Sequence, residues 1–228
     1  AVTKKAKQVA QKALNLSKSS SGLSLEQTKQ MSLLVAEKII AAEPILSQAH
    51  RDLGDGDHGL GMARGFTALT KELSENSHDN IRDLYQAAGN ALLTTMGGAS
   101  GVVFGSLFLA GGKTMHGAEF FGSHELSHLL SQSLKDVMSR GGAKPGDKTM
   151  IDALHPAAEA AKANIDKPLA ESIKAVAAAA EAGKEASKAM IATMGRAKTL
   201  GEKTIGLPDA GAISVTVILN TMADYING

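Results

Sequence analysis

Residues 24–40 read SLEQTKQMSLLVAEKII, and this stretch decides the class of fold. Ser24 and Gln27 have the spacing of a capping box, in which each side chain satisfies a free amide at the start of a helix. The stretch therefore predicts an amphipathic helix that runs up to Pro44. The apolar residues that recur at helical spacing are Met31, Leu34, Val35, Ile39 and Ile40.

The same helical periodicity continues along the chain, so we expect an all-α fold of about eight helices. Asp79 and Ser123 are predicted to cap two of the helices, and Gly141-Gly142 is predicted to end one. Residues 213–217 alternate like a strand, but the alternation is short and leads into a helical pattern. Four further helices are expected. One ends near Leu73, one follows Thr149, one contains residues 175–180, and one runs from Gly211 to Tyr225.

We expect one domain, because no linker rich in Pro or Ser divides the chain after the serines at 17–21, and no internal repeat is present. The domain is predicted to cover residues 23–228. Residues 1–22 are predicted to form an N-terminal extension, either a tail or a helix.

Composition and charge exclude several classes of protein. The 228 residues are 43% hydrophobic and 21% charged, which is typical of a globular chain that can bury a core. A net charge of +1 argues against a nucleic-acid binder, and the lack of Cys excludes a disulfide scaffold and a thiolate zinc site.

We expect a cytoplasmic protein, because no apolar core of an export signal follows the five Lys of residues 1–18. Residues 84–112 carry no charge, but polar residues and glycines interrupt them, so we expect two buried helices and no membrane span.

Residues 52–59 read DLGDGDHG and carry the sharpest chemical signal. Asp52, Asp55 and Asp57 are separated by glycines that let the backbone bend, and carboxylate oxygens are the ligands that Mg²⁺ and Ca²⁺ need. The spacing resembles the start of an EF-hand loop, but Ala or Phe stands where the loop requires its final Glu. A small ligand set suits Mg²⁺, whose shell is completed by phosphates and water. The alternative is a turn whose carboxylates only cap helices.

Three other glycine-rich segments lie at predicted helix ends. Residues 97–101 (GGASG) open a helix, where free amides attract phosphate; close packing of helices through small residues is the alternative. Residues 141–150 (GGAKPGDKTM) and 195–211 are polar connections, and Arg196 in the second is either a phosphate ligand or a surface charge. Sixteen of the 24 glycines fall in four clusters around these segments, at 54–65, 97–105, 141–146 and 195–211, which favours backbone shaped for phosphate and metal. A Walker A loop is excluded, because the GKT at 112–114 lacks its earlier glycine.

Together, the four segments resemble the nucleotide-binding L subunit, or C-terminal L domain, of the dihydroxyacetone kinase family. The similar motifs are GDGDHG at 54–59, GGASG at 97–101, PGDKTM at 145–150, and GRA at 195–197 followed by Asp209 and Gly211. The resemblance covers about residue 25 to the end. In length the chain resembles the separate subunit of the phosphotransferase-system type more than the single-chain ATP-dependent enzyme.

The resemblance implies a single-domain barrel of eight antiparallel helices, with ADP or ATP and two Mg²⁺ at one end. It implies that Asp55 and Asp57 are Mg²⁺ ligands and that they and Arg196 are the catalytic residues. The residues implied to bind the nucleotide come from all four segments: His58, Gly59, Leu60, Gly61, Ala99, Ser100, Gly141, Met150, Arg196, Asp209, Ala210 and Gly211.

The chain departs from the family pattern at three positions. The family's metal motif begins with an Asp five residues before Asp55, where this chain has His50. Imidazole is a poor ligand of Mg²⁺ compared with carboxylate, so either Asp52 substitutes, or one metal is weakened, or the second metal differs. In addition, Ala210 replaces a frequent Pro, and Gly61 replaces a common Asn.

The function implied by the resemblance is that of a kinase subunit. A phosphohistidine protein of the M-subunit type would phosphorylate the bound ADP, which would then pass the phosphoryl group to dihydroxyacetone or a related short ketose on a K subunit. Two alternatives stay open: an ATP-dependent kinase for another sugar-like acceptor, and a non-catalytic protein that senses nucleotide. A metal-dependent phosphatase is less favoured, because no water-activating His pair accompanies the carboxylates. We expect no nucleic acid or membrane as partner, and a homodimer is left open.

Overall fold

The computed structural model describes residues 22–228. In this part the chain forms α-helices and one 3-10 helix, and β pairing is limited to a bridge between Leu23 and Phe121. The predicted all-α class is confirmed, whereas the prediction for the N-terminal extension falls on residues 1–21, which lie outside the described part. The elements are α2 (Leu25–Ala41), α3 (Glu43–Leu53), α4 (His58–Glu75), α5 (Ile81–Thr95), α6 (Gly98–Thr114), α7 (Ser123–Gly141), α8 (Ile151–Ala163), α9 (Leu169–Ser187), η1 (Arg196–Thr204) and α10 (Ala210–Asn227).

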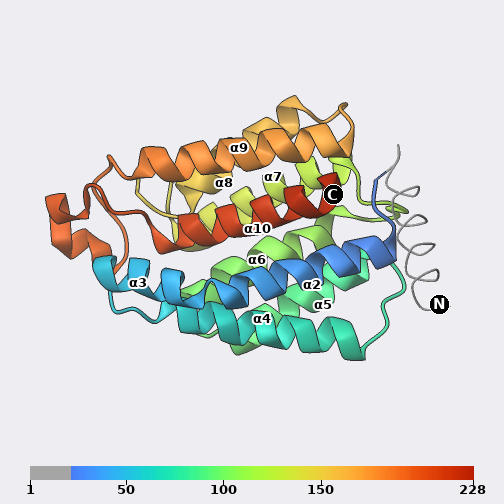
Figure 1. Ribbon diagram of the computed structural model, residues 1–228, viewed down its shortest axis with the longest axis horizontal. Helices are drawn as coiled ribbons and strands as arrows, with labels where there is room; N and C mark the ends of the chain where they lie inside the picture. The colour runs from blue at the N-terminus through green and yellow to red at the C-terminus, as the bar shows by residue number, and fades with distance from the viewer. Residues whose placement is uncertain (1–21) are drawn as a thin grey trace, which may run out of the picture.

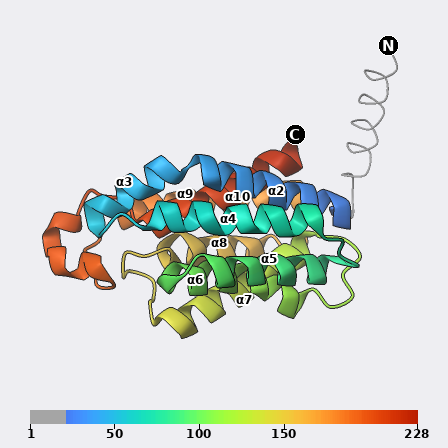
Figure 2. The same cartoon turned by 90° about the horizontal axis from the view of Figure 1, so that it is seen from below.

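The helices pack side by side in a closed ring (Figure 1 and Figure 2). From α4 to α10 each helix packs against the one before it, and α10 also packs against α2, which closes the ring. Only Ala42 separates α2 from α3, so the two follow one another as one rod of the ring. Pro44 lies in the first turn of α3, where a missing N–H is tolerated. The helix predicted to end at Pro44 therefore continues as α3. With α2 and α3 counted as one rod, the ring consists of eight rods.

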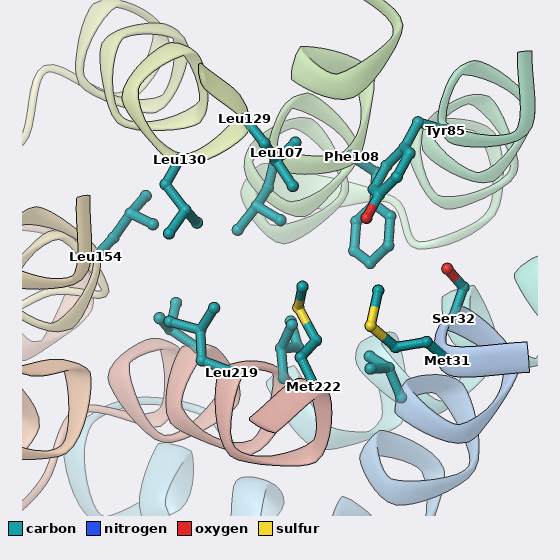
Figure 3. Close-up of a pocket in the computed structure, with 13 residues that line it drawn as sticks. Met31, Ser32, Tyr85, Leu107, Phe108, Leu129, Leu130, Leu154, Leu219 and Met222 are labelled. Carbon is teal, nitrogen blue, oxygen red and sulfur yellow. The ribbon is translucent and has the colours of Figure 1, made fainter. Parts of the chain in front are cut away.

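The axis of the ring is packed with apolar side chains. Figure 3 shows side chains of α2, α5, α6, α7, α8 and α10 that meet there. The cavity left between them is about 20 Å³, which is space for about one water molecule. The barrel is therefore a hydrophobic core and not an open channel. Within residues 22–228, no helix combines the length and apolar character that a membrane span needs.

Two of the predicted helix caps are wrong. Asn80 and not Asp79 caps α5, and Gly122 and not Ser123 precedes the first turn of α7. Both errors displace the start of a helix by one residue. The capping box of α2 and the end of α7 at Gly142 are confirmed.

Because consecutive rods alternate in direction, every second connection lies at the same end of the ring. The connections α3–α4, α5–α6, α7–α8 and α9–α10 lie at the left in Figure 1, and the C-terminus lies at the opposite end. These four connections contain the glycine-rich segments that the sequence singled out. The fold thus gathers segments that are far apart in sequence at one end of the molecule.

Gly183 is expected to be required where α8 and α9 approach each other near this end. A methyl group at this position would overlap the carbonyl oxygen of Asp152 and lie 2.7 Å from Cγ of Pro156. We expect Gly183→Ala to lower the free energy of unfolding by about 1–3 kcal/mol, as overpacking does, although alanine is the better helix former by about 1 kcal/mol.

Gly61→Ala is the matched control, because a methyl group there would meet nothing closer than 3.9 Å. This variant should be as stable as the wild type or more so. Urea unfolding followed by circular dichroism measures both variants. A Gly183→Ala protein as stable as the control would contradict the tight contact.

Candidate functional site

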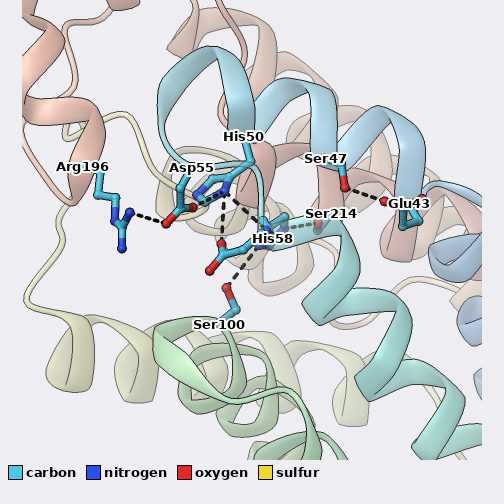
Figure 4. A network of polar contacts seen from close by, with 9 residues as sticks. Glu43, Ser47, His50, Asp55, His58, Ser100, Arg196 and Ser214 are labelled. Carbon is cyan, nitrogen blue, oxygen red and sulfur yellow. Dashed lines mark hydrogen bonds and ion pairs between the residues drawn. The ribbon is translucent and has the colours of Figure 1, made fainter.

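The short connection between α3 and α4, residues 54–57, turns two carboxylates toward the last turn of α3 (Figure 4). Gly56 has a φ of 82°, and a side chain at this position would overlap α3, so only glycine fits the turn. Nδ1 of His50 lies 3.3 Å from Oδ1 of Asp55 and 3.3 Å from Oδ1 of Asp57. The three donor atoms lie within 4.8 Å of one another, and these residues are called the His50 cluster below.

The His50 cluster fits a divalent cation. Ligand atoms at about 2.0–2.4 Å from a metal, with roughly tetrahedral or octahedral angles, stand about 3–3.5 Å apart. The two separations of 3.3 Å from Nδ1 agree with that spacing. The alternative of a turn that only caps helices does not account for Asp57, whose side chain accepts no hydrogen bond from the first turn of α4.

Asp52 does not join this cluster. It lies exposed on α3, and its carboxylate accepts a hydrogen bond of 2.8 Å from the side-chain amide of Gln48, one turn earlier. Of the two residues that the sequence left open as a third ligand, the structure therefore brings His50 and not Asp52 to the carboxylates.

The ring of His58, the first residue of α4, links the starts of three helices. Nδ1 lies 3.2 Å from the hydroxyl of Ser100 on α6, and Nε2 lies 2.9 Å from the hydroxyl of Ser214 on α10. Ser214 donates its proton to the carbonyl of Ala210 at 3.1 Å, so we assign Nε2 as the donor to Ser214 and Nδ1 as the acceptor from Ser100. Burial, assisted by the charge of His50, lowers the pKa of His58 to about 4. The neutral ring thus connects the His50 cluster to the GGASG segment.

Arg196 opens η1 and pairs with Oδ2 of Asp55. The arginine side chain is 74% exposed and that of Asp55 is 28% exposed. Partial burial opposes ionisation of Asp55, but hydrogen bonding with Asp57 and the nearby positive charges outweigh it and lower the pKa of Asp55. The carboxylate stays ionised, with one oxygen toward Arg196 and the other toward the His50 cluster.

Residues 188–209, called the Arg196 arm below, are fastened at their base by the PGDKTM segment. Nζ of Lys148 donates to the carbonyl of Ser187 at 2.8 Å, at the end of α9, and Lys148 is only 2% exposed. Asp147 accepts a hydrogen bond of 2.6 Å from the hydroxyl of Thr193. The backbone of Lys148 is left-handed, with a φ of 58°, which is costly for a residue with a side chain. The segment therefore positions the arm that carries Arg196.

The starts of α8 and α10 meet beside this base. The carboxylate of Asp209 caps α10 and accepts from the amide of Ala212 at 2.8 Å. A methyl group on Gly211 would lie 3.1 Å from Cβ of Met150, so the two helices leave no room for a side chain. Burial raises the pKa of Asp209 to about 6, and the neighbouring carboxylate of Asp152 adds to the rise. Three implied nucleotide-binding positions, Met150, Asp209 and Gly211, thus lie together.

The other implied nucleotide-binding positions lie at the same end and differ in exposure. Leu60 is 61% exposed in the first turn of α4, and Ala99 and Gly141 are exposed at the start of α6 and the end of α7. Gly59 is buried against α3, where a methyl group would overlap a serine hydroxyl. Its lack of a side chain therefore serves the packing of α4 on α3.

The start of α6 presents free amides. The N-cap residues of α4 and α6 accept no side-chain hydrogen bond from the first turn of their helix. In α4 the amide of His58 donates to His50 instead, whereas the start of α6 keeps donors that suit an anion. Nε of Arg64 donates to the carbonyl of Thr95 at 2.8 Å, and its guanidinium also bonds to the carbonyl of Met96. Arg64 thereby holds the turn that leads into the GGASG segment.

The chain is similar to proteins of known function. The DAK2 domain family matches residues 52–224. The ADP-binding subunit DhaL of the PEP-dependent dihydroxyacetone kinase of Escherichia coli (strain K12) is 35% identical over 182 residues, which are 78% of this chain and 86% of the relative. The chain belongs to the dihydroxyacetone kinase family.

Within this family, the chain is also similar to longer proteins. The L-erythrulose kinase of Pectobacterium atrosepticum is 34% identical over 178 residues, which are 76% of this chain and 30% of the relative. The crystal structure of the dihydroxyacetone kinase from C. freundii in complex with AMP-PNP and Mg²⁺ matches 90% of this chain with a TM-score of 0.69 and 27% identity. This chain covers 34% of that protein and thus spans about a third of its length. The likeness confirms the predicted fold class.

Sequence reasoning missed several residues that hold the segments of the site together. Asp147 and Lys148 stand inside the PGDKTM motif, so the motif itself was a signal, but of its residues only Met150 was assigned to the site. Arg64 and Ser214 carry no local signal, because their partners lie 31 and 156 positions away along the chain. Contacts of this kind follow from the ring and not from any short pattern.

Lys148→Met is expected to detach the base of the Arg196 arm. The substitution leaves the buried carbonyl of Ser187 without its charged donor, so we expect a loss of about 1.5–3 kcal/mol in the free energy of unfolding. Lys144→Met, which changes an exposed lysine of the same connection, should change it by less than about 0.5 kcal/mol. Equal urea-unfolding midpoints for the two variants would show that Lys148 does not carry this role.

His58 and Asp209 are expected to make the free energy of unfolding depend on pH in opposite directions between about pH 4 and pH 6. The pKa of His58 falls from 6.5 in an unfolded chain to about 4, so its contribution is lost as the pH falls through this range. The pKa of Asp209 rises from 3.8 to about 6, so its contribution is lost as the pH rises through the same range.

Urea unfolding of the metal-free protein at several pH values measures the two effects. As the pH rises, the free energy of unfolding of His58→Gln should decrease relative to that of the wild type. That of Asp209→Asn should increase relative to that of the wild type. Both substitutions keep a polar side chain at the site. Parallel pH curves for the three proteins would contradict the assigned pKa shifts.

Proposed function

We propose that this chain is the nucleotide-binding, phosphoryl-transfer subunit of a kinase that acts on dihydroxyacetone or a related short ketose. The observation that carries the proposal is the gathering, at one end of the ring, of the His50 cluster, Arg196 and the uncapped start of α6. Cation ligands, a guanidinium and free amides are the groups that the phosphates of a nucleotide need.

In this proposal the His50 cluster holds a divalent cation with the nucleotide. A cation bound there supplies positive charge to the phosphates during transfer. In the described chain one group of three donors gathers, so the second of the two Mg²⁺ ions that the resemblance implies would share these ligands. Asp57, with its side chain 78% exposed, is the member of the cluster most open to sharing.

The other residues bind and orient the nucleotide. The exposed guanidinium of Arg196 donates to phosphate oxygens, for which its planar fork is suited. The hydrogen bond between His58 and Ser100 fixes the start of α6, so that the amides of Ala99 and Ser100 meet the phosphates without reorganisation. Leu60, at the start of α4, offers an exposed apolar surface to the nucleoside.

We also propose that phosphate enters from a phosphohistidine protein of the M-subunit type and leaves to a ketose held on a K subunit. The similarity to the ADP-binding subunit named for Escherichia coli, which covers 86% of that relative, supports this division of labour. This chain would then supply charge and alignment, and the K subunit would supply the groups that activate the ketose.

An ATP-dependent transfer to another sugar-like acceptor is the second candidate. The similarity to an L-erythrulose kinase at 34% identity favours it. That relative is much longer than this chain, which matches 30% of it. The two candidates differ in the phosphate donor and in the acceptor, but they share the nucleotide site.

Reconstitution tests the proposed function. The purified chain is mixed with a K subunit, a phosphohistidine donor and dihydroxyacetone, and we expect tightly held ADP and ketose phosphate that forms only when all components are present. Asp55→Ala should lose ADP retention and turnover while its circular dichroism is unchanged, because it removes a ligand of the His50 cluster. Asp52→Asn should retain both, because Asp52 contacts only Gln48 in this region.

Each other outcome points to a different function. Turnover on free ATP without the phosphohistidine protein would favour the ATP-dependent candidate. ADP binding without turnover under either condition would indicate a nucleotide-sensing protein. Unchanged ADP binding in Asp55→Ala would show that the site is assigned wrongly.

A further inference from the structure

The imidazole of His50 is held in one orientation by its surroundings. The backbone of Gly54 lies beside the ring, since a methyl group on Gly54 would be in van der Waals contact with it, 3.4 Å from Nε2. On the other side the ring of His58 lies with its centroid 5.7 Å away. In this orientation Nδ1 is directed at the two carboxylates of the cluster.

Nδ1 of His50 is the ring nitrogen placed to bind a cation together with the two carboxylates. When this nitrogen carries no hydrogen, the backbone amide of His58 donates to it at 3.3 Å. A deprotonated imidazole nitrogen is the form that binds metal ions. The hydrogen bond is long and therefore weak, so it competes poorly with a cation.

Within residues 22–228, no third carboxylate lies with the two oxygens of this donor set. Asp52 is bonded to Gln48, and Glu43, farther back on α3, accepts from the hydroxyl of Ser47 at 2.5 Å. Within the described residues the donor set is thus one nitrogen and two oxygens. Arg196 binds Oδ2 of Asp55, whereas Oδ1 faces His50.

We propose that this donor set makes the site selective for a first-row transition ion, Mn²⁺ or one of its neighbours, over Mg²⁺. Mg²⁺ favours an octahedron of oxygen ligands, whereas Mn²⁺ and the later ions accept imidazole nitrogen with increasing affinity. The inference deepens the proposed function, because it names the cation that accompanies the nucleotide. The sequence left three alternatives open for the replacement of Asp by His50, and this proposal corresponds to the one in which the metal differs.

Binding measurements with Mn²⁺ and Mg²⁺, with and without ADP, test the selectivity. His50→Asp replaces the nitrogen with an oxygen ligand, so the ratio of Mn²⁺ affinity to Mg²⁺ affinity should fall by at least about tenfold, the effect of removing even an outer partner of a metal. Asp52→Asn is the control and should leave the ratio unchanged. If His50→Asp fails to fold by circular dichroism, His50→Gln supplies an oxygen ligand without a new charge.

A spectroscopic measurement tests whether the nitrogen binds the ion. In Mn²⁺-loaded protein labelled with ¹⁵N-histidine, electron spin-echo spectroscopy should show hyperfine coupling to ¹⁵N. The coupling should be absent in His50→Asp and present in His58→Gln. Because the label is on histidine, nitrogens of the nucleotide do not contribute.

The proposal requires both results. An unchanged affinity ratio in the His50 variants overturns it, and so does an absence of nitrogen coupling in the wild type. A protein that shows the coupling and the ratio change but binds no ADP would overturn the proposed function and leave the metal selectivity standing.

Discussion

Closure of a ring by eight rods of alternating direction is the constraint on which the rest of this structure depends. Alternation sends every second connection to the same end, so four glycine-rich segments meet there and the remaining connections form the other end. Closure itself, through the packing of α10 on α2, brings Ser214 to 2.9 Å from the ring of His58. Since these residues are 156 positions apart, no local structure could assemble the site, and a change that opened the ring would separate its halves.

A ring with a filled axis also requires neighbouring helices to approach closely, and glycine serves that purpose here. A methyl group on Gly89 would lie 2.6 Å from Leu109, and one on Gly105 would lie 3.0 Å from Cβ of Leu93. Gly65 is similarly enclosed by Met96. The sequence favoured phosphate and metal as the reason for the glycine clusters, but Gly65 and Gly105 stand inside those clusters and serve helix contacts. The abundance of glycine therefore has two causes, turns at the site and close packing along the rods.

The fold could be predicted from the sequence because helical periodicity and capping are local. The family motifs also indicated which segments would form the site. The choice between His50 and Asp52 could not be predicted, because two positions on a helix differ by about 200° in direction. Which of them faces the carboxylates depends on where α3 begins and ends. The sequence analysis placed the end of a helix at Pro44, which lies in the first turn of α3, and so did not predict these bounds. The hydrogen bonds of Lys148 and Arg64 were missed for a related reason, since their acceptors are backbone carbonyls, which have no sequence signature.

The Arg196 arm is held firmly at its base and lightly at its tip, and this difference suits the change of partner that the proposed function requires of Arg196. At the base, Lys148 and Asp147 are buried, and hydrogen bonds of such groups contribute about 1–3 kcal/mol each. At the tip, the pair between Arg196 and Asp55 is exposed on the arginine side, and water screens an ion pair of this kind so that it contributes little to stability. Arg196 can therefore leave Asp55 for a phosphate with little loss, while the base keeps the arm in place. The same exchange would leave Oδ2 of Asp55 open, next to the oxygen that already faces the His50 cluster.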